Sequence, residues 1–85
     1  MSTRGRRDLT EAAIVAALLK AGCDVRYAEK QPYDLLVGRA RQTYLLEIKS
    51  ALGKLTSSQV EFLKDWRGHY AVVKTAQQAL NAVGL

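Results

Sequence analysis

Hydrophobic residues in the first part of the chain recur at the spacing of an amphipathic helix. Ile14, Val15 and Leu18 fall on one face at intervals of three and four residues. Asp8 and Glu11 have the spacing of a capping box at a helix start, with Asp in place of Ser or Thr. We therefore predict a helix that begins at about Asp8 and places Glu11 at the edge of its buried face.

Short extended patterns follow the helix stop expected at Gly22. Alternating hydrophobic residues predict a first strand over 24–28, and two apolar runs predict strands over 33–37 and 43–49. A turn over 38–42 joins the two apolar runs into a hairpin. Both runs are apolar on both faces, as expected in a sheet that is covered on two sides.

The second half of the chain repeats this alternation of helix and strand. Thr56 is a candidate N-cap for a helix over 57–67, a strand is predicted over 69–74, and Thr75 can cap a last helix that ends near Ala82. The predicted fold class is therefore α/β, with the element order α-β-β-β-α-β-α and a mixed four-stranded sheet flanked by helices.

Length and composition indicate one small basic domain. The 85 residues divide into a flexible basic tail over 1–7 and a single domain over 8–85. The net charge of +5 favours a polyanionic partner, above all nucleic acid. One cysteine, Cys23, and one histidine, His69, exclude an internal disulfide framework and a zinc site.

The longest apolar stretch, 12–19, is too short to cross a bilayer, and the basic residues before it do not form a convincing signal peptide. We therefore expect a soluble, cytoplasmic protein of a bacterial or phage-infected host cell.

The residues with the most chemistry lie on the predicted hairpin. Glu47 and Lys49 are two residues apart on a strand, so their side chains point to one face. Counted from the turn, Asp34 is an approximate cross-strand neighbour of Glu47. Two carboxylates so close repel each other unless a proton or cation lies between them, and oxygen ligands favour Mg²⁺ or Mn²⁺. Lys49 can stabilise negative charge on an attacking hydroxide or a phosphate.

Each of these residues also has a purely structural interpretation. Asp34 can be a turn residue after a proline, and Glu47 with Lys49 can be an ion pair on a solvent-facing strand edge. Glu11 can be a plain capping residue, and Gln59 a polar residue in the first turn of a helix. Considered singly, Asp34, the ion pair and Gln59 favour the structural interpretation, whereas for Glu11 the structural and functional interpretations are equally favoured. The joint arrangement of these residues favours a functional site.

The segment Pro32-Tyr33-Asp34, the hairpin and Glu47-Ile48-Lys49 together resemble the PD-(D/E)xK nuclease motif. The sequence departs from this motif at Tyr33, which separates the proline from the aspartate. The Tyr33 side chain is expected to fill the core rather than to stack on a base.

The flanking segments resemble one branch of that superfamily. Glu11 in the preceding helix and Thr56 to Gln59 in the following helix are similar to the flanking motifs of the VRR-NUC branch. That branch comprises virus-type replication and repair nucleases, including compact stand-alone phage and bacterial proteins. The resemblance extends from about Asp8 to Leu80 and implies a small restriction-endonuclease-like core.

The resemblance also implies a function and a metal site. Asp34 and Glu47 would bind Mg²⁺ or Mn²⁺ directly, the backbone carbonyl of Ile48 would be a further ligand, and Glu11 would reach the metal through water. The expected activity is metal-dependent endonuclease cleavage of branched DNA, a four-way (Holliday) junction or a flap, in DNA repair. Because one small subunit has few residues to hold a duplex, we expect a homodimer.

The remaining expected site residues act on the substrate. The resemblance implies that Lys49 activates the attacking water and stabilises the transition state, and that Gln59 holds Lys49 or that water. Basic residues outside the site are the candidate contacts to DNA phosphates, and they read the backbone and shape rather than bases. These candidates are Lys54, Arg39, Arg41, Arg4, Arg6 and Arg7.

Two alternatives remain open from the sequence. A double-stranded-RNA-binding module is also basic and has the order α-β-β-β-α, but it needs no converging carboxylates. A protein-interaction subunit could also have kept a nuclease fold without activity.

Overall fold

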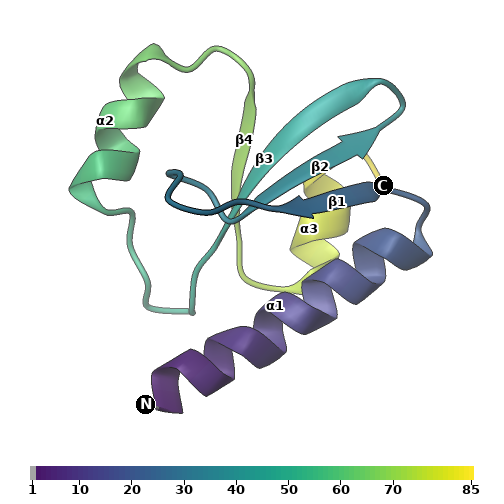
Figure 1. Ribbon diagram of the computed structural model, residues 1–85, viewed down its shortest axis with the longest axis horizontal. Helices are drawn as coiled ribbons and strands as arrows, with labels where there is room; N and C mark the ends of the chain where they lie inside the picture. Colours follow the sequence, from purple (N-terminus) through teal and green to yellow (C-terminus); the bar gives the residue numbers. More distant parts are fainter. Residues whose placement is uncertain (1) are drawn as a thin grey trace.

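The computed structural model describes the backbone of residues 2–85 and the side chains of residues 9–85. Seven elements follow in the predicted order, which confirms the α/β fold class. Figure 1 shows a central sheet with α1 crossing below it and α2 standing to one side. The elements are α1 (Ser2–Lys20), β1 (Asp24–Tyr27), β2 (Leu35–Arg39), β3 (Gln42–Ile48), α2 (Ser57–Asp65), β4 (His69–Val73) and α3 (Ala76–Ala82).

The sheet is mixed, as predicted, and its four strands lie in chain order. Strand β2 is antiparallel to both β1 and β3, and β4 runs parallel to β3. A parallel neighbour requires the chain to return to the same end of the sheet, and α2 lies in this crossover connection. The strand β3 is therefore central, with a strand on each side.

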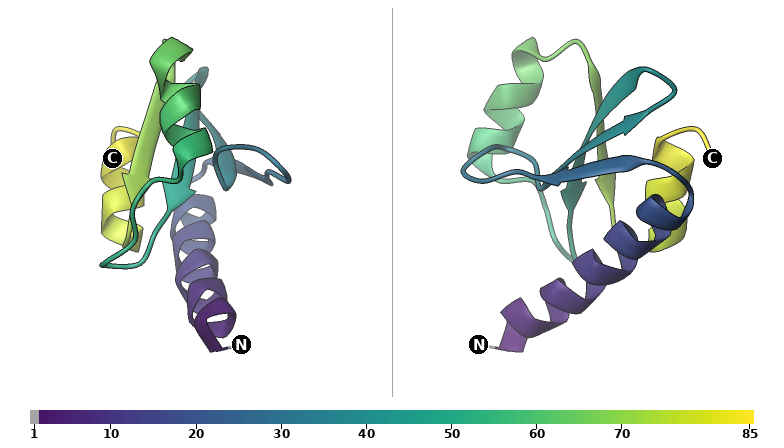
Figure 2. Two further views of the ribbon diagram at one scale, coloured as in Figure 1. Left: turned by 90° about the vertical axis from the view of Figure 1, so that its left-hand side faces the viewer. Right: turned by 45° about the vertical axis from the view of Figure 1, so that its right-hand side comes forward.

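One face of the sheet is closed by α1 and α3. Leu35 pairs with Leu46, and both are fully buried together with Leu18 of α1 and Val83 after α3. Figure 2 shows α3 against this face of the sheet. Burying one such side chain contributes about 1.5–3 kcal/mol, so this layer supplies most of the core.

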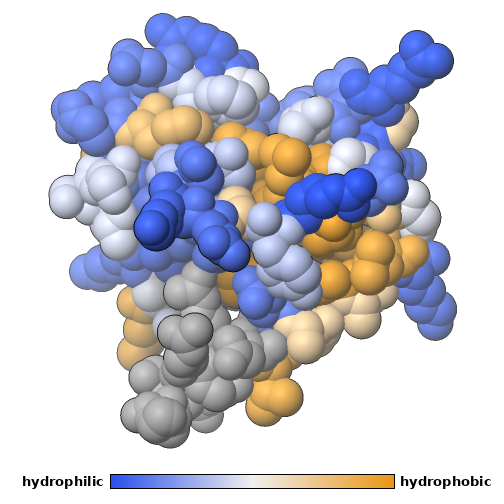
Figure 3. Space-filling model, viewed as in Figure 1, coloured by the Kyte–Doolittle hydropathy of each residue, from blue (hydrophilic) through white to orange (hydrophobic). Residues whose placement is uncertain are grey.

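The second face is only partly covered. Leu36 pairs with Leu45, which pairs with Tyr70, so these three side chains share this face. Leu36 is 37% exposed and Val72 is 40% exposed, whereas Leu45 in the middle is buried. Figure 3 shows hydrophilic residues over α2 and the hairpin tip, with an apolar area over the strands between them.

The first helix begins at Ser2, so the predicted start at about Asp8 was wrong. No proline precedes Asp8, and the arginines there are good helix formers, so the backbone can continue the helix towards the N-terminus. The capping-box spacing of Asp8 and Glu11 consequently does not mark the helix start. The flexibility predicted for the tail over 1–7 remains a prediction, and the side chains of residues 1–8 lie outside the described part.

The hairpin between β2 and β3 is longer than predicted. Its turn consists of Ala40 and Arg41 alone, both with positive φ (53° and 65°), and Arg39 pairs directly with Gln42. Two positive φ values match the right-handed twist of a two-residue hairpin. The predicted five-residue turn over 38–42 was wrong because Ala and Arg rarely adopt this conformation and its usual Gly or Asn is missing.

The remaining element boundaries agree closely with the sequence. Gly22 ends α1 with φ of 92°, and Thr56 and Thr75 are N-caps, as predicted. Helix α2 ends at Asp65, two residues earlier than expected, because Trp66 already has extended backbone.

Candidate functional site

The strand register brings Asp34 and Glu47 to the same end of the hairpin. The pairing of β2 with β3 ends with Leu35 opposite Leu46, and Asp34 and Glu47 are the next residues beyond that pair. Because side chains alternate along a strand, the Glu47 carboxylate points to the face opposite the buried Leu46. The count from the turn, which made Asp34 and Glu47 approximate cross-strand neighbours, agrees with this register, because β2 and β3 are extended equally on both sides of the turn.

The Asp34 carboxylate continues the hydrogen-bond ladder beyond the end of β2. Its Oδ2 accepts the backbone N–H of Ile48 at 2.7 Å, while its own N–H donates to the Leu46 carbonyl at 2.9 Å. A short hydrogen bond from an N–H to a carboxylate is stronger than a neutral one. Asp34 is therefore fixed against β3, which goes beyond the role of a plain turn residue after Pro32.

Glu47 and Lys49 form a buried ion pair on the central strand. Lys49 Nζ lies 3.0 Å from Glu47 Oε2, and their side chains are only 15% and 4% exposed. A buried carboxylate is costly unless a cation or hydrogen-bond donors compensate its charge. The alternative of a solvent-facing pair on a strand edge was wrong, because β3 has a neighbouring strand on each side and both side chains are largely buried.

Ile48 links this site to the core. Its side chain is 2% exposed and belongs to the core cluster on the other face. Its N–H points towards Asp34, and the N–H and C=O of one strand residue point to the same side. The Ile48 carbonyl therefore points from β3 towards β2, the direction in which Asp34 lies, as a backbone ligand would require.

Tyr70 is a member of this site that the sequence did not reveal. Its hydroxyl donates to the Pro32 carbonyl at 2.7 Å. Burial, then the negative charges of Glu47 and Asp34, raise the pKa of Tyr70 from 10.0 to about 12. The same negative potential that disfavours a tyrosinate favours a cation. Only the parallel register of β4 places Tyr70 here, and that register joins segments far apart in the chain.

Gln59 lies at the start of α2 and is 6% exposed. Its Oε1 accepts the Thr56 N–H at 2.9 Å, and its backbone N–H donates to Thr56 Oγ1 at 3.2 Å, which completes a capping box. The interpretation of Gln59 as a helix-start residue is therefore confirmed. Because the capping box uses the amide oxygen of Gln59, only the amide nitrogen is left for the predicted contact to Lys49 or a water. That contact stays a prediction.

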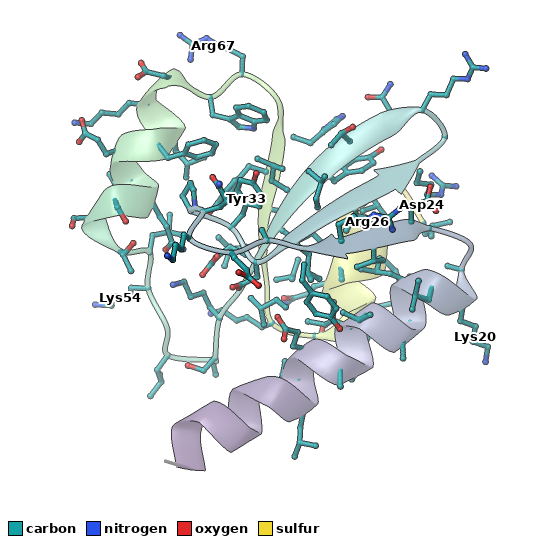
Figure 4. The ribbon with its side chains drawn as sticks, viewed as in Figure 1. Lys20, Asp24, Arg26, Tyr33, Lys54 and Arg67 are labelled. Carbon is teal, nitrogen blue, oxygen red and sulfur yellow. The ribbon has the colours of Figure 1, made fainter. Side chains whose placement is uncertain are left out.

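Aromatic side chains join α2 to the face that carries the site. The Phe62 ring lies 6.3 Å from Tyr33, 5.9 Å from Tyr70 and 5.3 Å from Trp66, measured between ring centroids. Figure 4 shows Tyr33 between the strands and α2. Tyr33 is half-buried in this aromatic cluster and lies outside the core cluster, so the core role predicted for it is not confirmed.

Glu11 lies half-buried on α1, next to the buried Ile14, Val15 and Leu18. This position at the edge of the buried face agrees with the prediction. Among residues 9–85, no group of three or more His, Cys, Asp and Glu side chains has the geometry of a metal cluster. The contact of Glu11 to a metal through water stays a prediction.

The candidate DNA contacts fall into separate regions. Lys54 is exposed on the connection from β3 to α2, where Figure 4 shows it pointing away from the sheet. Arg39 donates from Nη1 to the Val83 carbonyl at 3.0 Å, which gives it a structural role at the end of α3. Arg41 lies at the hairpin tip, roughly 20 Å from Asp34 at about 3.4 Å per strand residue. The side chains of Arg4, Arg6 and Arg7 lie outside the described part.

The donor atoms at the end of the hairpin fit a hard cation. Two carboxylates and a backbone carbonyl are oxygen ligands, the type that Mg²⁺ and Mn²⁺ prefer. Glu47 is already paired with Lys49, so a bound cation would share this carboxylate with the ammonium group. The fit rests on Asp34, Glu47 and Ile48, all of which are held by strand pairing.

Comparison of the chain with protein-family models, with curated proteins and with solved structures gives no match. Among the described residues, no helix has the length and hydropathy needed to span a membrane.

Proposed function

We propose that this protein is a metal-dependent DNA endonuclease that hydrolyses phosphodiester bonds in branched DNA, a four-way junction or a flap, as a homodimer. One observation carries the proposal. A buried Glu47–Lys49 ion pair on a central strand lies across the hairpin from Asp34, whose carboxylate is bound to the N–H of Ile48. A fold has no structural need to collect these charges on one buried strand end, because apolar residues there would stabilise it equally well.

Asp34, Glu47 and the Ile48 carbonyl would hold Mg²⁺ or Mn²⁺ at the end of β3. When bound, the metal supplies Lewis-acid activation of the scissile phosphate and lowers the pKa of a bound water. Strand pairing and the Ile48 hydrogen bond keep the two carboxylates in place, so little reorganisation accompanies the reaction.

Lys49 would stabilise the negative charge that develops on the phosphate. Its ammonium group is oriented by Glu47 at 3.0 Å and is mostly removed from solvent. A positive charge in such surroundings acts more strongly than in water. The amide nitrogen of Gln59 would position Lys49 or the attacking water, and Glu11 would contact the metal through water.

Backbone recognition is the mode of DNA binding that the charges support. The net charge of +5 favours phosphate contacts, and Lys54 follows the catalytic strand by only a few residues. A two-fold homodimer would present two equivalent sites to two strands, which suits a junction or a flap.

A cleavage assay tests this proposal. Purified protein is incubated with a four-way junction, a flap and a continuous duplex of the same sequence, with Mn²⁺, with Mg²⁺, or with EDTA. We expect metal-dependent cutting of the branched DNAs above that of the duplex. Equal cutting of all three would refute branch specificity, and absence of cutting under every condition would refute the nuclease assignment.

A further inference from the structure

A tight turn directly after the candidate catalytic strand carries an unusually exposed leucine. Leu52 is 91% exposed, more than any other large hydrophobic side chain in the described part of the chain. The Gly53 N–H donates to the Ser50 carbonyl at 3.0 Å, which closes the turn. Figure 1 shows the connection from β3 to α2 descending below the sheet before it rises to α2.

The turn is held in a fixed position relative to Lys49. Lys74 Nζ donates to the Ala51 carbonyl at 3.0 Å and so ties the turn to the end of β4. A Cβ atom on Gly53 would lie 3.1 Å from Lys49 Cβ and 3.2 Å from Ser50 N, which is closer than an ordinary contact. The turn therefore folds back tightly against Lys49, and Leu52 is presented from a constrained backbone.

The charges near this leucine favour an anionic partner. From Lys49 to Val60 the chain contains Lys54 and no Asp or Glu, and Lys74 is attached to the turn from β4. An exposed leucine beside lysines suits a partner that offers both apolar surface and phosphates. An opened base step has both, since the bases are apolar on their faces and the phosphates flank them.

We propose that Leu52 is an apolar wedge that inserts between bases at the branch point of the DNA, while Lys54 and Lys74 contact the flanking phosphates. The inference rests on the proposed function for its partner, branched DNA. Base stacking is already interrupted at a branch, so insertion of a side chain there costs less than in a continuous duplex. The wedge would thereby select branched DNA and place the strand beside Lys49.

A fluorescent base analogue at the branch point tests the wedge. A four-way junction carrying 2-aminopurine at the branch is titrated with protein in EDTA, so that binding is measured without cutting. The wild-type protein is expected to raise the fluorescence as the base unstacks. Leu52→Ala is expected to lose this rise and to bind the junction about tenfold more weakly, because most of the inserted apolar surface is gone.

Leu9→Ala is the matched control. Leu9 is 75% exposed and lies on α1 rather than on the turn, so this variant should keep both the fluorescence rise and the affinity. Equal fluorescence and affinity for Leu52→Ala and the wild-type protein would overturn the wedge. A change of oligomeric state in Leu52→Ala, measured by analytical ultracentrifugation, would also overturn it, because Leu52 would then be a contact between copies of the chain.

The two proposals fail separately in this design. A wild-type protein that raises the fluorescence but cuts no DNA with Mn²⁺ refutes the nuclease assignment and supports the wedge. A protein that cuts the junction while Leu52→Ala behaves as the wild type refutes only the wedge.

Discussion

The two faces of the sheet are built from the same alternating strands, but they are covered and used differently. On one face, Leu35 and Leu46 are fully buried under α1 and α3. On the other, Glu47 and its neighbour Asp34 lie beside an aromatic cluster that holds α2. Neighbouring residues of β3 thus lie in opposite surroundings, one apolar and one charged. The apolar residues of the first face supply most of the stability of the fold. The second face can therefore carry buried charges, although these cost free energy.

This contrast is sharpest in β3, where Leu46 and Glu47 are adjacent in the chain. We expect Glu47→Ala to reduce cleavage of branched DNA at least about 1,000-fold, since it removes a proposed metal ligand and the partner that orients Lys49. The fold should form but be less stable, because Lys49 is left in largely buried surroundings without its partner, so the cleavage rate is measured per folded molecule. Cleavage rates and circular dichroism measure the two effects. Normal cutting by Glu47→Ala would refute the proposed mechanism.

The matching substitution on the first face is Leu46→Ala. Leu46 is fully buried, so this change should lower the free energy of unfolding by about 2–5 kcal/mol. The rate per folded molecule should stay within a few-fold of the wild type, because no charged group is moved. Urea unfolding and cleavage at low temperature check these results. If Leu46→Ala stopped cleavage without lowering stability, the proposed division between the faces would be wrong.

Lys49→Ala separates charge stabilisation from metal binding. We expect the cleavage rate to fall about 100- to 1,000-fold, as for the loss of one group that stabilises the transition state. Mn²⁺ should still bind, because Asp34, Glu47 and Ile48 remain, and titration calorimetry measures this directly. Lys54→Ala is the control: it removes an exposed lysine a few residues further on and should weaken DNA binding without a comparable loss of rate. Loss of Mn²⁺ binding in Lys49→Ala would contradict the assigned role.

Tyr70→Phe probes the electrostatics of the second face. In protein without added metal, Tyr70 keeps its proton up to about pH 12, whereas the unfolded chain loses it near pH 10. The raised pKa therefore stabilises the fold below pH 10, and this contribution is lost as the pH rises towards 12. Tyr70→Phe should cost about 1 kcal/mol at neutral pH through the lost hydrogen bond to Pro32. The free energy of unfolding of this variant should also fall less steeply between pH 10 and 12 than that of the wild-type protein.

The control for this prediction is Tyr27→Phe. Tyr27 is 62% exposed on the edge strand β1. Its substitution should leave both the stability at neutral pH and the slope above pH 10 close to those of the wild type. The electrostatic assignment of Tyr70 fails if both variants show the same slope.

Local patterns were enough to predict much of the fold and the centre of the site. The position of Asp34 and Glu47 at the same end of the hairpin depends on a short turn and on the two-residue alternation of strands, so it can be counted from the sequence. Thr56 and Thr75 were predicted correctly as N-caps, because capping depends on a few adjacent residues.

The features that were missed depend on distant contacts or on strained backbone. Tyr70 reaches the carboxylates through the parallel pairing of β4, and Arg39 meets Val83 near the end of the chain. Neither contact has a local signal. The turn at Ala40 and Arg41 was also missed, because neither residue type favours the left-handed conformation that the hairpin imposes.

Asp34→Asn tests the central claim most directly, because an amide oxygen can still accept the Ile48 N–H while the negative charge is lost. The measurement is Mn²⁺-dependent cleavage of a four-way junction by this variant and by the wild-type protein, at equal concentration of folded protein. We predict that the wild type cuts the junction and that Asp34→Asn does not, with the same unfolding transition for both. Equal cutting by the two proteins would contradict a metal site at Asp34 and Glu47.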